Sequence, residues 1–441
     1  MLRDLSLFRN MLSLKELLHF LSLSEPNIRY VVFGTIMVGI ASAVIGNFTF
    51  LRKRALVGDA IAHAVLPGIC LAFMLQGSRT LWVLLPGAFV SGWLALLSID
   101  WINRNSRLKP DAAIGLVLSV FFGAGVLLLT YIQQTGDGSQ SGLKHFLFGQ
   151  AAAILPGDLW VFGLTGLLLC GLVALFFKEF TLLSFDPDFA QAAGLPVRRL
   201  ELLLSTLTVL AVVTGIQTVG VVLMAALLIT PAAAARFWTD RLGAMVLLGA
   251  AFAALASVLG SFVSYQQPNM PTGPWIIVVL SGIAFLSMVF APRRGGLARL
   301  WDKLRHTWKI REENVLKAIY HSGESLGDFT AGMHEEAVQG RRAFNPWQLR
   351  LSLWTLQRRG LLQHNASGYR LSGEGLREGA RLARIHRLWE LYLTEYLRLA
   401  PDHVHDDAEA MEHLITPELE AQLEAALGYP QRDPHDRDIP R

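Results

Sequence analysis

The sequence has little cysteine and, over most of its length, little charge. Only two cysteines, Cys70 and Cys170, occur among 441 residues, which is too few for a disulfide framework or a zinc ribbon. Residues 29–291 hold only 24 of the 74 charged side chains. The phosphate-binding pattern GxxxxGK[ST] is also absent. These shortages exclude a disulfide-stapled scaffold and a P-loop ATPase within this sequence.

Apolar residues, in contrast, are abundant and unevenly placed. Hydrophobic residues make up 52% of the sequence, and the mean hydropathy is +0.40. Several runs approach or exceed about 18 apolar residues, the length expected of a membrane-spanning helix. Residues 292–441 hold 44 of the charged side chains, as an ordinary polar domain would. The composition therefore argues against a purely soluble enzyme, and the net charge of +4 says little about nucleic acid.

The apolar segments predict about nine membrane crossings. Segment 200–234 is too long for one crossing, because a single helix of that length would span about 52 Å against a hydrocarbon core of about 30 Å. A split near Gly215–Gly220 gives two short spans. The segments, counted before this split, are 30–51, 56–76, 80–102, 112–132, 159–177, 200–234, 242–265 and 274–291.

Loop charges predict the orientation of these spans. Cations cluster after alternate spans, and they fall on one side of the membrane only if 200–234 crosses twice. Nine spans then place the N-terminus outside and the C-terminal domain in the cytoplasm. Residues 1–28 carry an apolar stripe without a small-residue cleavage site, so we expect an outer interfacial helix instead of a cleaved signal peptide. The clustered cations are Arg52, Lys53, Arg54, Arg104, Arg107, Lys109, Lys178, Arg198, Arg199, Arg236, Arg241, Arg293 and Arg294.

The expected cytoplasmic loop 178–201 is amphipathic, and a Gly-Leu-Pro sequence at 194–196 interrupts it. One interpretation is a plain connecting loop. Such a loop would not need the apolar side chains Phe180, Phe185 and Phe189. A short helix along the membrane surface, with apolar side chains that dock a partner, is therefore expected.

The run 51–68 contains ionisable residues within an apolar segment. Asp59, His63 and Pro67 are spaced i, i+4, i+8 and share one helix face. Pro67 cannot donate a hydrogen bond to the carbonyl of His63, so carboxylate, imidazole and carbonyl together suit a divalent metal such as Mn²⁺. Alternatively, Asp59 caps the helix start and His63 makes a structural hydrogen bond. Spacing alone does not separate these interpretations.

Three other polar residues are weaker candidates for contact with substrate or partner. His145 and Asp158 fall in the long outer loop, where solvated side chains are expected. Gln217 falls at the proposed break in 200–234. Breaks of this kind often line a translocation path, and a simple turn is the alternative.

Three stretches resemble permease subunits of the zinc/manganese/iron ABC transporter family: LRKRALVGDAIAHAVLPG (51–68), FDPDFAQAAGLPVRRLELLL (185–204) and QTVGVVLMAALLITPAAAARF (217–237). The resemblance covers about residues 30–291, within a membrane domain expected at 29–291. It implies a metal site at Asp59 and His63 and a second permease subunit. It also implies a separate cytoplasmic ATPase, an external solute-binding protein and a bacterial plasma membrane location. The loop expected to dock the ATPase includes Phe185, Asp186, Pro187, Ala193, Gly194, Leu195 and Pro196.

After a basic linker at 292–308, residues 309–385 follow the outline of a winged helix-turn-helix. IREENVLKAIYHSG is an amphipathic helix, NPWQLRLSLWTLQRRGLLQ begins with Asn-Pro and ends at Gly360, and HNASGYRLSGEG forms a short hairpin wing. The fold class expected for the whole chain is therefore an all-α polytopic membrane protein with a C-terminal cytoplasmic winged-helix and helical dimerisation domain.

Residues 386–441 contain side chains of metal-ligand type at helical spacing. Two sets, on consecutive helices, share a face within each helix, and hard ligands of this kind favour Mn²⁺ or Fe²⁺ over Zn²⁺. A solvated charged face is the alternative. HRLWELYLTEYLRLAPDHVHDDAEAMEHLI (386–415) resembles metal-dependent repressors of the diphtheria-toxin-repressor and manganese-regulator family, which implies a metal site. The candidate ligands are His386, Glu390, His405, Glu409, Glu412 and His413.

This domain departs from the resembled family in its first helix. Asn314 and Lys317 occupy positions where that family has acidic residues, and a lysine opposes a cation. Arg350, Arg358 and Arg359 are candidate phosphate contacts to DNA, or plain surface charge. Three hypotheses follow: a metal permease whose fused domain senses cytoplasmic metal, a permease fused to a DNA-binding repressor, and a membrane-anchored regulator that does not transport.

Overall fold

A computed structural model describes residues 14–77, 80–135, 149, 151, 154–266, 270–341, 344–398 and 415–440 of the chain. They fall into two compact units, Met1–Arg299 and Leu300–Arg441. The described part of the first unit is helical throughout, and that of the second contains helices and one two-stranded sheet. Each unit is considered by itself.

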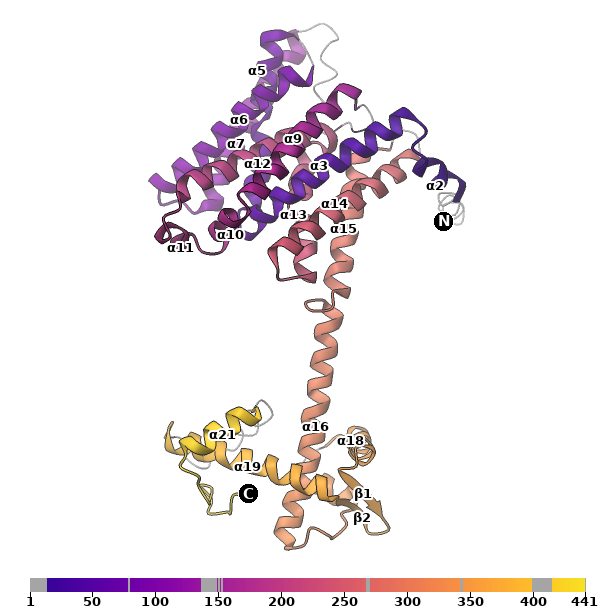
Figure 1. Ribbon diagram of the computed structural model, residues 1–441, viewed down its shortest axis with the longest axis vertical. Helices are drawn as coiled ribbons and strands as arrows, with labels where there is room; N and C mark the ends of the chain where they lie inside the picture. The colour runs from indigo at the N-terminus through magenta and orange to yellow at the C-terminus, as the bar shows by residue number, and fades with distance from the viewer. Residues whose placement is uncertain are drawn as a thin grey trace. The chain divides into compact units, whose positions relative to one another are not determined.

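The first unit is a bundle of long apolar helices (Figure 1). Among its described residues, eight helical stretches are long and apolar enough to cross a membrane. The expected polytopic all-α fold is therefore confirmed. Its helices are α2 (Leu14–Leu21), α3 (Pro26–Leu51), α4 (Ala55–Ala64), α5 (Leu66–Gln76), α6 (Leu81–Asn105), α7 (Pro110–Thr135), α9 (Pro156–Leu175), α10 (Phe177–Phe185), α11 (Pro187–Ala192), α12 (Val197–Val219), α13 (Val221–Trp238), α14 (Leu242–Tyr265) and α15 (Thr272–Phe290).

Segment 200–234 is divided, as its length predicts. Helix α12 ends at Val219 and α13 begins at Val221. Gly220 between them has φ +89°, a conformation that residues with a Cβ atom rarely adopt. The apolar part of α13, Met224–Trp238, is shorter than the eight long stretches, so the ninth crossing stays a prediction.

Helix α3 lies at the centre of the bundle and packs against α9, α12, α13 and α14. Glycine permits the closest of these approaches. A Cβ atom on Gly46 of α3 would lie only 1.9 Å from the carbonyl oxygen of Leu228 in α13. Backbone contact of this kind is typical of helix packing in membranes, where small residues let helices approach.

The expected surface loop is two short helices, α10 and α11. Phe180 and Leu183 of α10 are fully buried, whereas Phe185 and Phe189 are each 58% exposed. The Asp186 side chain caps α11 by accepting a hydrogen bond from the Phe189 N–H at 2.9 Å. One face of this segment therefore holds it against the bundle, and the other leaves aromatic side chains exposed.

The second unit has the expected helix, helix and wing. The wing is an antiparallel hairpin with Leu362 opposite Leu371 and Asn365 opposite Gly368. Residues 296–308 of the basic stretch form the first turns of the long helix α16. The elements are α16 (Gly296–Leu326), α17 (Glu335–Arg341), α18 (Pro346–Arg358), β1 (Leu362–Asn365), β2 (Gly368–Leu371), α19 (Gly373–Glu395) and α21 (Pro417–Ala426).

Candidate metal, docking and regulatory sites

Asp59 and His63 lie together on α4, one helical turn apart. Atom Nε2 of His63 is 3.7 Å from Oδ1 of Asp59, as the i, i+4 spacing predicts. The His63 side chain is 20% exposed and the Asp59 side chain 37% exposed, so both are accessible from outside a single chain. The pair thus presents a carboxylate and an imidazole side by side.

The other ring nitrogen of His63 has no hydrogen-bond partner among the described residues. Atom Nδ1 is buried and unpaired, and the ring packs edge-to-face on Phe122 of α7 with centroids 5.0 Å apart. A structural histidine would normally use this nitrogen. A metal-ligating histidine normally uses its second ring nitrogen as well, so the unpaired Nδ1 atom does not separate a ligand role from a structural one.

The helix that carries the pair ends where the sequence contains proline. Helix α4 stops at Ala64, and α5 begins at Leu66 with Pro67 in its first turn. The Ala64 carbonyl accepts a hydrogen bond of 2.6 Å from the Ser91 hydroxyl of α6. Segment 56–76 was expected to form a single span, so this break is a detail that the sequence did not predict.

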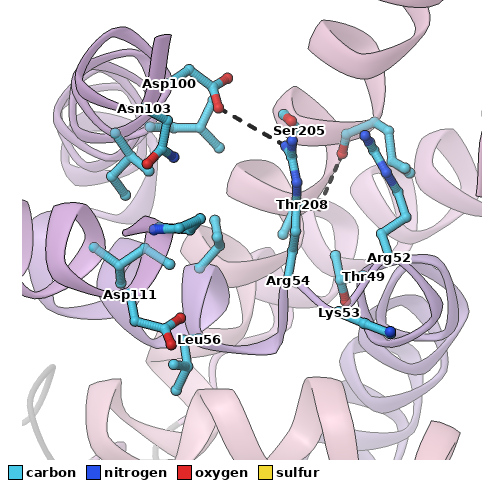
Figure 2. A pocket seen from close by; sticks show the side chains of 16 residues that line it. Thr49, Arg52, Lys53, Arg54, Leu56, Asp100, Asn103, Asp111, Ser205 and Thr208 are labelled. Carbon is cyan, nitrogen blue, oxygen red and sulfur yellow. Dashed lines mark hydrogen bonds and ion pairs between the residues drawn. The ribbon is translucent and has the colours of Figure 1, made fainter. Parts of the chain in front are cut away.

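A cavity of about 370 Å³ lies at the start of α4. The turn between α3 and α4 lines one side with Arg52, Lys53 and Arg54. On the other side Figure 2 shows the labelled residues Asp100, Asn103 and Asp111. Charges of opposite sign therefore face each other across this space.

The candidate ATPase-docking residues form one continuous surface segment. Phe185 ends α10, Asp186 caps α11, and Pro187 begins α11. The next residues turn the chain toward α12, for which Pro196 is the N-cap. Gly194 makes this turn with φ +83°. Ala193, Gly194, Leu195 and Pro196 thus lie between two helices, next to the exposed aromatic side chains.

In the second unit, His386 and Glu390 of α19 form a buried pair. Their side chains are 5% and 4% exposed, and Nε2 of His386 is 3.1 Å from Oε1 of Glu390. The other candidate ligands of this unit, His405, Glu409, Glu412 and His413, lie outside the described residues. Among the residues that the structure describes, no three His, Cys, Asp or Glu side chains come together as a metal site.

The residues that depart from the repressor pattern are buried as well. Asn314 and Lys317 of α16 are 7% and 6% exposed. Within the part of the chain that the structure describes, the Asn314 side-chain oxygen is buried without a hydrogen-bond partner. Helix α16 therefore presents an amide and an amine to the interior, where the resembled repressors have acidic side chains.

The three candidate DNA-contacting arginines are engaged within the unit. Arg350 donates to Glu335 of α17 at 2.8 Å, and Arg359 donates to Glu312 of α16 at 2.7 Å. The guanidinium of Arg358 lies 4.1 Å from the centroid of the Trp354 ring. Each cation is partly satisfied without a phosphate.

Sequence reasoning missed a buried arginine at the centre of the second unit. Arg387 is 1% exposed. Its guanidinium donates to both carboxylate oxygens of Glu324 at 2.9 and 2.7 Å and lies 3.5 Å from Asp433. It joins α19 to the end of α16 and to the C-terminal segment. An arginine in a polar stretch gives no sequence signal for such burial.

The same cluster shifts two pKa values in α16. Burial lowers the pKa of the His321 imidazole, and a hydrogen bond with Glu324 opposes this effect. For Glu324, burial alone raises the pKa of the carboxyl, but the hydrogen bonds from Arg387 and His321 outweigh burial and lower it. The carboxylate of Glu324 is therefore stabilised in its charged form.

Asp158 corrects one expectation. Instead of lying solvated in a loop, it is 8% exposed in the first turn of α9. Its Oδ2 accepts hydrogen bonds from the Leu155 N–H at 3.0 Å and from Gln217 Nε2 at 3.1 Å. The carboxylate caps α9 and holds the end of α12. His145 lies outside the described residues.

Each of the two units matches a known protein family. The model of the ABC 3 transport family matches residues 24–291. The chain belongs to the ABC 3 transport family. A second family model, the iron dependent repressor, metal binding and dimerisation domain, matches residues 372–441. Both resemblances expected from the sequence are thereby confirmed, and the chain is an ABC 3 permease with a fused repressor-like domain.

Three relatives illustrate the match. The manganese transport system membrane protein MntC of Bacillus subtilis is 43% identical over 383 residues, 86% of this chain and 87% of that protein. The zinc transport system membrane protein TroC of Treponema pallidum is 43% identical over 282 residues, 64% of this chain and 95% of that protein. The solved structure of PsaBC from Streptococcus pneumoniae in complex with Fab has a TM-score of 0.57 and 36% identity, and the match covers 63% of this chain and 97% of that one.

Proposed function

We propose that this ABC 3 permease imports a divalent transition metal, manganese, iron or zinc, and that Asp59 and His63 are its ligands in the membrane. The observation that carries this proposal is the pair itself, a carboxylate and an imidazole 3.7 Å apart on a helix of an apolar segment. Ionisable side chains within membrane segments usually mark ion pathways. The relatives named for manganese and zinc transport support the same class of substrate.

Two donors from one chain do not complete the coordination of such a metal, which needs at least four. A second permease subunit, identical or related, would supply another pair. The partial exposure of Asp59 and His63 supports this arrangement, because the pair is reachable from outside its own chain. The metal is then held between two subunits at the axis of the transporter.

The remaining partners follow from the same assignment. The exposed segment from Phe185 to Pro196 docks a cytoplasmic ATPase through its exposed aromatic side chains. This ATPase is a separate protein, because the sequence given has no P-loop pattern. An external solute-binding protein delivers the metal to the opposite side. The loop cations favour a cytoplasmic location for this segment and for the second unit, in a bacterial plasma membrane.

Uptake of radioactive Mn²⁺ by cells that depend on this transporter tests the ligand assignment. Asp59→Ala and His63→Ala are each expected to abolish uptake at unchanged membrane abundance, because a site of few ligands loses occupancy when one is removed. His19→Ala is the matched control, since His19 is an exposed histidine of the same unit. Normal uptake by both ligand variants would contradict the assignment.

For the second unit, we propose a cytoplasmic metal sensor that restrains transport. Asn314 and Lys317 of α16, which replace acidic residues of the resembled repressors and are buried, favour this role over DNA binding by an intact repressor. A ligand shifts transport only if it binds two states of the protein differently, so metal held by this unit would favour the slow state.

Uptake into vesicles preloaded with Mn²⁺ separates the two roles. Full-length protein is expected to slow as internal metal rises, and truncation after Pro292 is expected to remove this slowing. Equal slowing of both forms contradicts the sensor. Metal-dependent protection of a specific DNA site by residues 309–441 would favour the permease–repressor alternative.

A further inference from the structure

The cavity at the start of α4 is crossed by an ion-pair network centred on Arg54. Atom Nη1 of Arg54 is 3.9 Å from Oδ1 of Asp100 in α6, and Nη2 is 3.9 Å from Oε1 of Glu201 in α12. Arg52 also donates to Glu201. Figure 2 shows Arg54 reaching from the α3–α4 turn toward Asp100. One guanidinium therefore links the ends of three helices.

The opposite wall of the cavity offers oxygen atoms. Asp100 and Asp111 supply carboxylates, and the side-chain oxygen of Asn103 is buried without a hydrogen-bond partner in the described structure. Oxygen ligands of this kind suit hard and borderline divalent cations. The cavity thus combines a wall that attracts a divalent cation with a positive charge that repels it.

Helix α4 connects this cavity to the metal pair. Leu56 lines the cavity, and Asp59 and His63 follow it at i+3 and i+7, on the same helix face. A cation that leaves the pair along this face reaches the cavity after passing Leu56. The distance along the helix axis from Leu56 to Asp59 is only about 4.5 Å.

We propose that this cavity is the inner vestibule of the cation path and that Arg54 is its electrostatic barrier. This proposal rests on the function proposed above. While Arg54 lies between Asp100 and Glu201, its charge opposes entry of cytoplasmic cations toward Asp59. A departing metal ion competes with Arg54 for Asp100, so release requires the guanidinium to move aside.

The test measures how charge controls access to position 56. The full-length chain, with Cys70→Ala and Cys170→Ala, receives Leu56→Cys as its sole thiol. Inside-out membrane vesicles are treated from the cytoplasmic side with two thiol reagents of similar size, one neutral and one carrying a quaternary ammonium group. The ratio of the cationic to the neutral modification rate reports the electrostatic barrier and not the width of the opening.

Arg54→Gln is expected to raise this ratio about tenfold, because one positive charge next to the path is lost. Asp100→Asn is expected to lower it, because the barrier keeps its cation and loses its counter-charge. Lys53→Asn is the matched control. Lys53 lines the same cavity, but it is exposed, so solvent screens its charge, and the ratio should change less than about twofold. Its backbone has φ +56°, a conformation that asparagine tolerates.

An unchanged ratio in Arg54→Gln, or equal acceleration of both reagents, overturns the barrier, because a merely structural loosening would act on both reagents alike. Protection by Mn²⁺ tests the connection to the metal pair. In Arg54→Gln, cytoplasmic Mn²⁺ should slow modification of the introduced thiol, and Asp59→Ala should abolish this protection. If Arg54→Gln raises the ratio of modification rates but Mn²⁺ gives no Asp59-dependent protection, the proposed metal ligands are wrong and the barrier stands. If Mn²⁺ protects but the ratio is unchanged, the barrier is wrong and the metal ligands stand.

Discussion

Replacing Arg387 by methionine should destabilise the second unit strongly. The substitution keeps an unbranched side chain but removes both hydrogen bonds to Glu324 and the ion pair with the 2%-exposed Asp433 side chain. Breaking a buried pair by removing one partner costs about 3–5 kcal/mol. Solvent reaches the Glu324 side chain, which is 34% exposed, so we expect a loss near the lower limit, about 3 kcal/mol.

Proteolysis of the purified full-length protein at increasing urea concentrations measures this loss. The urea dependence of cleavage within the second unit gives its free energy of unfolding. Arg432→Met is the matched control, because Arg432 is 61% exposed and pairs with Asp436 at the surface. Its loss should stay below about 1 kcal/mol. Equal losses for Arg387→Met and Arg432→Met would refute the inference that the buried guanidinium holds the unit together.

Three further perturbations have defined outcomes. Burial lowers the pKa of His321 below its ordinary value of 6.5, so the unfolded state binds more protons than the folded state as the pH falls through that value. The second unit should therefore lose stability in this pH range, and His321→Gln should reduce the loss, as measured by urea titrations at several pH values. Phe185→Glu should weaken ATPase recovery in a pull-down, since it charges an exposed apolar docking residue, and unchanged recovery would contradict the docking assignment. Gly46→Ala places a methyl group 1.9 Å from the Leu228 carbonyl oxygen and should lower the free energy of unfolding of the first unit by about 1–3 kcal/mol. Gly115→Ala, whose methyl group meets no described atom within 4 Å, should leave this free energy unchanged.

The sequence predicted features that depend on local pattern. Apolar runs gave the membrane helices, and the excess length of segment 200–234 gave the break that the structure places at Gly220. The i, i+4 spacing gave the Asp59–His63 pair. Each of these rests on neighbouring residues, whose geometry within a helix is nearly fixed.

Contacts between distant residues were not predictable in this way. Arg387 meets Glu324 from 63 residues away, and Gln217 meets Asp158 from 59 residues away. In the sequence each is a polar residue without a visible partner. Only the tertiary packing of α16 on α19, and of α9 on α12, reveals that Arg387 and Asp158 are buried and that these groups are paired.

Mn²⁺ binding by the purified chain tests the central assignment most directly. Electron paramagnetic resonance of free Mn²⁺ gives the amount bound, and truncation after Pro292 separates sites in the membrane unit from any in the second unit. We expect the truncated protein to bind one Mn²⁺ per two permease chains, and Asp59→Ala or His63→Ala to remove this binding. Undiminished binding by the truncated Asp59→Ala and His63→Ala variants would contradict a metal site at this pair.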